Sequence, residues 1–203
     1  LSLHDALPIS NHVARHYMGT FRPYTDRNFY PGRTCDSDWT DTSKLNYGDR
    51  DTWQKMLDIL LFWAARGING FRCDMAELVP VEFWAWAIPQ VRKRYPTLLF
   101  IAEIYQPWRY AEYVFQGGFD YLYDKVGLYD TLVAILCGQS SATAITGCWQ
   151  ALGDLTPHML HFMENHDERR LASDFICGEG RRAYPAMMVS ALIDTCPIMV
   201  YFG

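Results

Sequence analysis

An arginine and a carboxylate share one face of a short predicted strand, Gly70-Phe71-Arg72-Cys73-Asp74. Because side chains alternate along an extended strand, Arg72 and Asp74 point one way, whereas Phe71 and Cys73 point the other. A charge pair at the end of an apolar strand costs desolvation that packing does not repay. Arginine–aspartate pairs also occur as plain structure, but this position favours a functional site over a structural ion pair.

Polar residues follow two further predicted strands at the point where each strand ends. Glu103 follows one apolar run, and Asn165-His166-Asp167 follows another. The C-terminal strand ends form the catalytic rim of a (β/α) barrel, so we expect Asp74, Glu103 and Asp167 to meet there. An acidic residue after one strand often caps a helix, but the coincidence at three strand ends indicates a catalytic site.

Three carboxylates with an arginine and histidines suit glycoside hydrolysis. In that reaction one carboxylate attacks the anomeric carbon while another protonates the leaving oxygen. A metal-dependent hydrolase fits less well, because His158 and His161 are three residues apart and face opposite sides of a strand. We interpret each of these two histidines as a core or surface residue.

Strand and helix signals alternate along the chain and would position these residues. Apolar residues at helical spacing predict a helix from Asp51 to Gly67, with Asp51 and Gln54 as its cap. A second helix is predicted over 80–95, disturbed at Pro89. Further strands are predicted at 98–102, 119–123, 159–163 and 198–202, and helical stretches at 109–116, 128–152 and 183–195.

The alternation of strands and helices indicates an α/β fold with a parallel sheet, either doubly wound or closed as a (β/α) barrel. No G-x-G-x-x-G motif or P-loop follows any predicted strand, which argues against nucleotide binding. With 203 residues, half of them hydrophobic, the chain has apolar material for one core.

Composition argues against some classes of binding partner and is compatible with a carbohydrate ligand. The net charge of −5 and the lack of a basic stripe argue against nucleic acid and an anionic membrane surface. The sequence has no apolar run of about 18 residues for a membrane span. Aromatic residues make up 15% of the chain, and their faces stack on sugars as well as filling cores. Six cysteines have no C-x-x-C spacing and are interpreted as buried thiols.

Four motifs together resemble those of the α-amylase superfamily, glycoside hydrolase family 13, in order and spacing. Gly70-Phe71-Arg72-Cys73-Asp74, Ala102-Glu103 and Phe162-Met163-Glu164-Asn165-His166-Asp167 are similar to its second, third and fourth sequence regions. Asn11-His12-Val13-Ala14 resembles the tail of the first region. The resemblance spans 11–203 and implies a (β/α)8 TIM-barrel that is incomplete, from the end of the third strand to the eighth strand.

The resemblance also implies a role for each matched residue. Asp74 would be the nucleophile, Glu103 the general acid/base, and Asp167 the carboxylate that grips the sugar hydroxyls. The implied substrate-binding residues are Arg72, His12, His166 and Asn165. The guanidinium would keep the nucleophile ionised, whereas an apolar strand end would favour the protonated form of the general acid.

Two departures from the family pattern bear on calcium and on completeness. Glu77 and Leu78 replace a Lys-His pair that follows the nucleophile in typical α-amylases, so Ca2+ and a role for Asn11 as its ligand stay open. The family's strand before Asn11 is absent, so we interpret 11–203 as part of a catalytic barrel. Within that reading, residues 1–10 are non-native sequence, and 15–50 are a long loop or small inserted domain.

The favoured function is a retaining glycoside hydrolase of α-amylase type. It would cleave α-1,4-glucosidic bonds in starch, glycogen or maltooligosaccharides through a covalent glycosyl-enzyme. A transglycosylase of the same family, either a glucanotransferase or a maltosyltransferase, shares every catalytic residue and stays an alternative. A non-catalytic binding relative is the third class; it predicts the loss of a carboxylate, and all three are present. Compartment and oligomeric state are left open.

Overall fold

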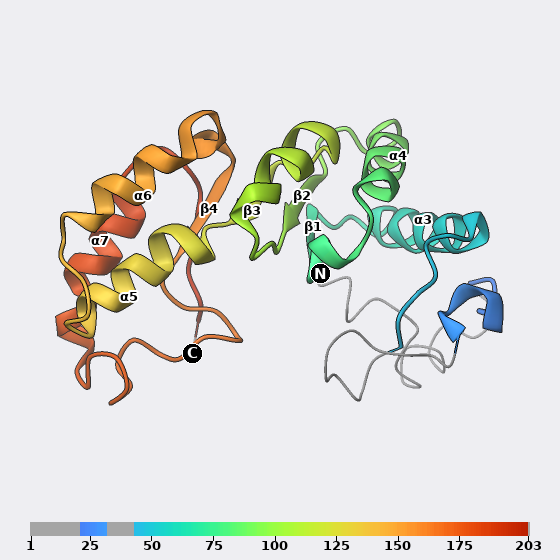
Figure 1. The fold of residues 1–203 in the computed structure, drawn as a ribbon. Helices are drawn as coiled ribbons and strands as arrows, with labels where there is room; N and C mark the ends of the chain where they lie inside the picture. Colours follow the sequence, from blue (N-terminus) through green and yellow to red (C-terminus); the bar gives the residue numbers. More distant parts are fainter. Residues whose placement is uncertain (1–20, 32–42, 203) are drawn as a thin grey trace. The chain divides into compact units, whose positions relative to one another are not determined.

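The computed structural model describes residues 21–31 and 43–202 of the chain. Asn11, His12 and the segment 1–10 lie outside the described residues. The chain divides into two compact units, here called unit 1 (1–103 and 115–119) and unit 2 (104–114 and 120–203). Figure 1 traces the helices and strands that alternate along the sequence in each unit.

Unit 1 contains two parallel strands, and a helix precedes each of them along the chain. Its elements are, in order, η1 (Asp26–Asn28), α3 (Arg50–Ala64), β1 (Gly70–Cys73), η3 (Ala76–Leu78), α4 (Val81–Arg92) and β2 (Leu99–Ala102). Strands β1 and β2 pair with Phe71 opposite Phe100. The predicted parallel pairing of the two strands that end at Asp74 and Glu103 is therefore confirmed.

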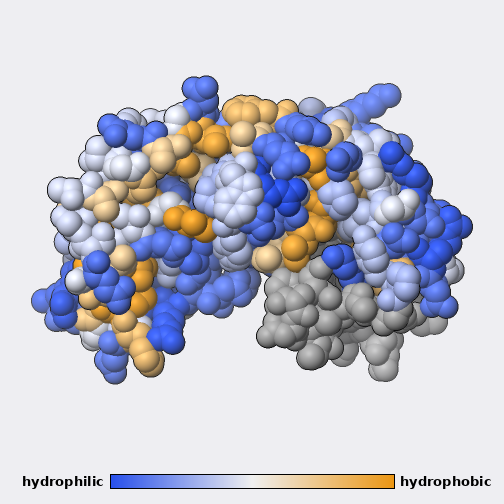
Figure 2. Space-filling model, viewed as in Figure 1, coloured by the Kyte–Doolittle hydropathy of each residue, from blue (hydrophilic) through white to orange (hydrophobic). Residues whose placement is uncertain are grey.

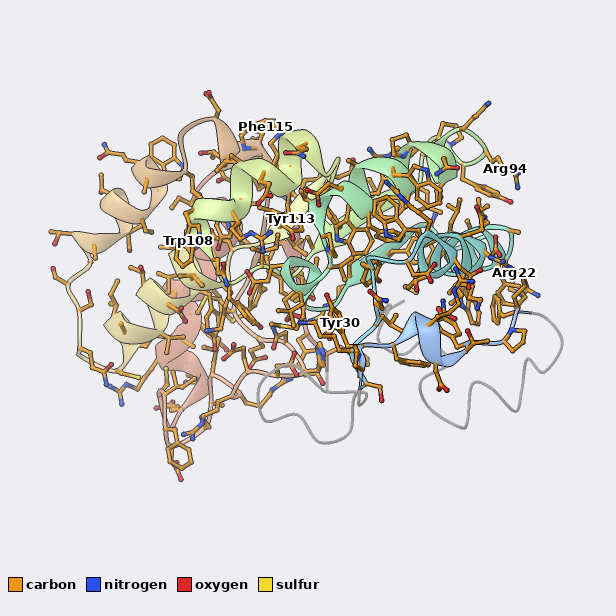
Figure 3. The ribbon with its side chains drawn as sticks, turned by 45° about the vertical axis from the view of Figure 1, so that its right-hand side comes forward. Arg22, Tyr30, Arg94, Trp108, Tyr113 and Phe115 are labelled. Carbon is orange, nitrogen blue, oxygen red and sulfur yellow. The ribbon has the colours of Figure 1, made fainter. Side chains whose placement is uncertain are left out.

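The N-cap of helix α3 lies two residues before the predicted one. Asp49 is the N-cap, and its side chain accepts a hydrogen bond from the Asp51 amide at 2.8 Å, so the predicted cap by Asp51 and Gln54 was wrong. The extended backbone of Asp49 lets its carboxylate turn toward the free N–H groups of the first turn. Arg22 lies beside this helix in Figure 3 and bonds its two acidic residues Asp51 and Asp58 at 3.1 and 3.3 Å.

Helix α4 continues through Pro89 to Arg92, so the residue that was expected to disturb the helix does not end it. A proline removes its own N–H from the helix ladder, and its ring crowds the carbonyl of the residue four positions earlier. The carbonyl of Pro89 still accepts the amide of Lys93 at 3.0 Å, so the last turn stays closed.

The core of unit 1 is aromatic. Phe71 and Phe100 lie side by side on the strand pair, with ring centroids 5.5 Å apart. Phe119 joins them to α4, because its ring lies 6.4 Å from Phe100 and 5.0 Å from Trp84. All four are nearly or fully buried, so a large part of the aromatic content of unit 1 fills its core.

Gly70 allows the two strands of unit 1 to approach closely. A Cβ at this position would lie 2.7 Å from the backbone oxygen of Leu99. That oxygen belongs to the neighbouring strand and has no room to move, so the position needs a residue without a side chain.

Unit 2 holds three strands, in which β4 pairs in parallel with both β3 and β5. Its strands and α-helices are β3 (Tyr121–Tyr123), α5 (Asp130–Leu136), α6 (Ala144–Leu152), β4 (Met159–Phe162), α7 (Tyr184–Leu192) and β5 (Ile198–Met199). Shorter helical turns lie between them: η4 (Pro107–Arg109), η6 (Lys125–Tyr129), η7 (Gly153–His158) and η8 (Gly180–Ala183). The predicted strands are confirmed in position, although each is shorter.

Two elements differ in kind from the sequence prediction. The stretch predicted as one helix over 109–116 is a 3-10 turn that leads into the π-helix η5 (Glu112–Gln116). Strand β5 stops at Met199 rather than Phe202, because its partner β4 itself ends at Phe162 and offers no further backbone groups. Strand length is thus set by the neighbour rather than by the apolar run.

The core of unit 2 is formed by buried residues that join its helices. They are Leu128, Leu132, Met163, Leu171, Cys177, Ala183 and Ala186. Helix α5 packs against α6 and α7, and Figure 2 shows hydrophobic surface, in orange, over the region that these helices occupy in Figure 1. Among the described residues, no helix has both the length and the apolar character that a membrane crossing needs.

Candidate active site

Strand β1 separates its core residues from its polar ones. Phe71 and Cys73 are fully buried, whereas Gly70 and Arg72 are partly exposed. This alternation matches the prediction that Arg72 faces away from the core. The Arg72 side chain is 13% exposed and that of Asp74 is 24% exposed, so solvent and ligands reach both groups.

One guanidinium contacts two carboxylates. Arg72 donates from Nη1 to Asp74 Oδ1, and from Nη2 to Glu103 Oε1 at 2.5 Å. Charge-assisted bonds of this kind are the strongest hydrogen bonds in proteins, and the planar guanidinium fixes their directions. The structure therefore brings together three of the predicted site residues within unit 1.

The loop after β1 is held by hydrogen bonds to both the side chain and the backbone of Glu103. The second carboxylate oxygen of Glu103 accepts from the Met75 amide at 2.9 Å. Its backbone donates to Cys73 and accepts from Ala76, both at 3.0 Å. Its side chain is only 2% exposed, so these contacts hold a buried carboxylate in a fixed place.

Met75 adopts a left-handed backbone conformation, with φ at 40°. A non-glycine residue in this region costs free energy and persists only where its surroundings require it. Here the conformation lets the Met75 amide reach Glu103 while Asp74 stays in contact with Arg72. Strain of this kind is typical of functional sites.

The second predicted cluster follows β4 in unit 2. Asn165 is buried, and its side-chain oxygen accepts from the amides of Asp167 and Glu168 at 2.9 and 2.8 Å. His166 and Asp167 are about half exposed, with His166 Nε2 lying 3.1 Å from Asp167 Oδ2. Asn165 thus shapes the loop that presents the other two side chains.

Sequence reasoning missed a buried cluster around His161. His161 is not a plain core residue: Nδ1 lies 3.1 Å from Asp124 Oδ2, and Nε2 lies 3.1 Å from both oxygens of Asp194. Burial lowers the pKa of His161, but the close contacts with the carboxylates of Asp124 and Asp194 outweigh that effect, so its pKa is raised. Asp124 directly follows a predicted strand, and this was the signal that marked Asp74 and Glu103.

Solved structures of α-glucan-active enzymes share this fold. The chain is similar to an α-amylase from Lactobacillus plantarum, with a TM-score of 0.69 and 26% identity, over 92% of this chain and 46% of that one. A cyclic α-maltosyl-(1→6)-maltose hydrolase from Arthrobacter globiformis gives a TM-score of 0.68 at 20% identity, over 95% and 45%. The chain therefore has the α/β fold of an incomplete (β/α) TIM-barrel.

Curated relatives match a shorter stretch. An α-1,4-glucan:maltose-1-phosphate maltosyltransferase from Rhodospirillum rubrum is 39% identical over 56 residues, which is 28% of this chain and 8% of that protein. A protein of the same name from Burkholderia pseudomallei is 40% identical over 53 residues, or 26% and 5%. No protein-family profile matches the chain. In sequence and fold the chain is thus similar to α-glucan-active enzymes, in agreement with the resemblance of its motifs to those of the α-amylase superfamily.

Proposed function

We propose that the chain carries catalytic residues of a retaining enzyme that acts on α-glucans, with hydrolysis of α-1,4-glucosidic bonds as its reaction. The observation that carries this proposal is the guanidinium of Arg72, which contacts both Asp74 and Glu103. Two carboxylates held by one small planar group lie close together, and a close pair suits retention better than inversion, which needs room for a water.

Asp74 acts as the nucleophile in this proposal. The guanidinium of Arg72 fixes the position of the Asp74 carboxylate by a hydrogen bond, and a carboxylate is the group that attacks the anomeric carbon. The attack forms a bond from Asp74 to the sugar and breaks the bond to the glycosidic oxygen, which leaves with a proton from Glu103. Water then gives its proton to Glu103 and its oxygen to the sugar, and Asp74 is released.

Glu103 has to carry a proton at the first step. The guanidinium of Arg72 at 2.5 Å and the Met75 amide at 2.9 Å both favour the ionised form of Glu103. The contact to Arg72 therefore has to loosen when substrate binds, so that Glu103 can take up a proton and turn toward the glycosidic oxygen. After the first step Glu103 is a carboxylate again. Its restored contact with Arg72 suits this form, which acts as the base in the second step.

The remaining roles follow the family resemblance. Asp167 grips sugar hydroxyls and stabilises positive charge on the ring at the transition state, and His166 hydrogen-bonds the same sugar. Both side chains are about half exposed, which supports a direct contact with substrate. Asn165 acts through the loop, since its oxygen is already used by two backbone amides. His12 stays a predicted sugar ligand.

Glycosyl transfer is the second candidate function. The curated relatives described above are named as maltosyltransferases that use maltose 1-phosphate, although the chain aligns with only a small part of each. Transfer uses the same two carboxylates, because a sugar hydroxyl replaces water in the second step. The two reactions differ in the acceptor rather than in the residues that this chain provides.

Product analysis separates the two candidates. The full-length protein is incubated with maltohexaose alone, and in parallel with maltohexaose and maltose 1-phosphate. Shorter sugars alone support hydrolysis, whereas longer sugars with release of phosphate support maltosyl transfer. Longer sugars without maltose 1-phosphate support a glucanotransferase. Binding of maltohexaose without any turnover would contradict both enzymatic proposals and favour the binding relative.

A further inference from the structure

The buried cluster around His161 is built like the surroundings of a metal-ligating histidine. Such a histidine almost always donates one ring N–H to a carboxylate, a backbone carbonyl or a water while its other nitrogen holds the metal. In unit 2, Asp124 lies 3.1 Å from Nδ1 of His161, and Asp124 and His161 are 1% and 2% exposed. Among the described residues, neither Asp124 Oδ2 nor His161 Nδ1 has a well-formed hydrogen bond.

Two further ligand atoms lie on the Nε2 side of the same ring. Asp194 and Cys196 belong to the turn before β5, and the Cys196 amide donates to Asp194 Oδ1 at 2.8 Å. One atom from each of His161, Asp194 and Cys196 lies within 4.8 Å of the others. Donor atoms gathered this closely fit around one small ion with bonds of about 2.0–2.3 Å.

We propose that His161 Nε2, an Asp194 carboxylate oxygen and Cys196 Sγ form a Zn2+ site, with Asp124 as the carboxylate that orients His161. Imidazole, carboxylate and thiolate are the ligand types that zinc takes in proteins, usually in a tetrahedral arrangement. A thiolate disfavours the hard ions Ca2+ and Mg2+. The side chain of Asp194 is 12% exposed, so an ion has a way in and water can take the fourth position.

Binding of the ion changes the protonation of its ligands. Cys196 now lies 2.8 Å from the carbonyl oxygen of Thr156, to which its thiol donates. Zinc binding releases that thiol proton to solvent, and it also releases any proton on His161 Nε2, because only the deprotonated atoms coordinate. The tautomer with a proton on Nδ1 is the one that Asp124 favours.

The site would join distant parts of unit 2. His161 is in the middle of β4, and Asp194 and Cys196 lie in the turn that leads from α7 to β5. Strand β5 has only two residues, so few backbone bonds hold this turn to the sheet. A bound ion adds a cross-link at that point, and it stabilises the folded state more the further its free concentration exceeds its Kd. None of the proposed catalytic carboxylates takes part.

Cobalt substitution tests the site in the full-length protein. Metal is first removed with a chelator under reducing conditions, and Co2+ is then added while the visible and near-ultraviolet absorption is recorded. We expect one equivalent of Co2+ to give the bands of a tetrahedral site and a thiolate-to-cobalt charge-transfer band, both lost when Zn2+ is added. Absence of a stoichiometric charge-transfer band in the wild-type protein would overturn the proposal.

Three variants identify the ligands. Cys196→Ser is expected to lose the charge-transfer band, and Asp124→Asn to weaken Zn2+ binding by about 10- to 100-fold, as for other residues that orient a ligand. Cys137→Ser is the matched control, since Cys137 is also partly buried and lies at the end of α5. The proposal fails if folded Cys196→Ser, checked by circular dichroism, keeps the band. If Cys196→Ser does not fold, the wild-type titration decides.

Discussion

The guanidinium of Arg72 reaches across the parallel pair of β1 and β2 to contact Glu103 at 2.5 Å. The register makes this contact available, because Arg72 lies opposite Ile101 and Glu103 follows two residues later. The same guanidinium contacts Asp74, so its two Nη groups link the residues that follow β1 and β2. The proposed chemistry depends on this bridge.

Arg72→Lys tests the bridge. Lysine keeps the positive charge but has no planar fork, so it cannot hold both carboxylates in fixed directions. A small misplacement of reacting groups lowers turnover by about 100-fold, and we expect a loss of that size in kcat/KM. Arg22→Lys is the control, because Arg22 is exposed and, among the described residues, bonds the acidic residues of α3 (Figure 3) rather than the carboxylates of the candidate site. Equal activities of the two variants would contradict the role of Arg72.

Glu103→Gln distinguishes the general acid from the nucleophile. The variant is expected to lose activity on α-1,4-glucans by about 100- to 10,000-fold, the usual size of general acid–base catalysis. With α-glucosyl fluoride the first step survives, because fluoride leaves without a proton. Added azide is then expected to restore turnover, measured as fluoride release. Equal loss on both substrates, with no effect of azide, would assign Glu103 another role.

Gly70→Ala tests the close approach of β1 and β2. The new Cβ would lie 2.7 Å from the backbone oxygen of Leu99, so we expect a loss of about 1–3 kcal/mol in the free energy of unfolding. Gly147→Ala in α6 is the control, since a Cβ there meets nothing within 4 Å. That change is expected to stabilise the protein by about 0.5–1 kcal/mol, because glycine weakens a helix. Urea unfolding measures both, and similar effects would contradict the packing described here.

We expect Asp51 to make the stability of unit 1 sensitive to acid. Hydrogen bonds from Lys55 and Asn28 lower the pKa of Asp51 from 3.8 to about 2. A lowered folded-state pKa contributes stability above the ordinary value, and this contribution is lost as the pH falls from about 4 to about 2. We therefore expect Asp51→Asn to reduce the difference between urea midpoints at pH 5 and pH 3. Asp58→Asn is the control on the same helix, and a loss of acid sensitivity there instead would contradict the assignment.

The sequence predicts the strands and the parallel pairing of β1 with β2, but it does not predict their register. The strand ends before Asp74 and Glu103 can be read from local apolar runs and the polar residues that follow them. The contact from Arg72 to Glu103 depends on the register between β1 and β2, which local patterns do not contain. The length of β5 likewise depends on where β4 ends.

The cluster around His161 shows the same limit more strongly. Its carboxylates come from Asp124 and Asp194, far away in the sequence on either side. Spacing arguments consider neighbours, so they compared His161 with His158 and found no shared face. The position of Asp124 after a strand was available from the sequence, but its partner was not.

Covalent trapping tests the central claim, that Asp74 is the nucleophile, most directly. The full-length Glu103→Gln protein is treated with a 5-fluoro-α-glucosyl fluoride, which forms the glycosyl-enzyme quickly and releases it slowly. Digestion and mass spectrometry then locate the sugar. The account predicts one fluoroglucosyl group on the peptide that contains Asp74, and none in Asp74→Ala. A label on Glu164 or Asp167 instead, or no label together with products of inverted anomeric configuration, would contradict it.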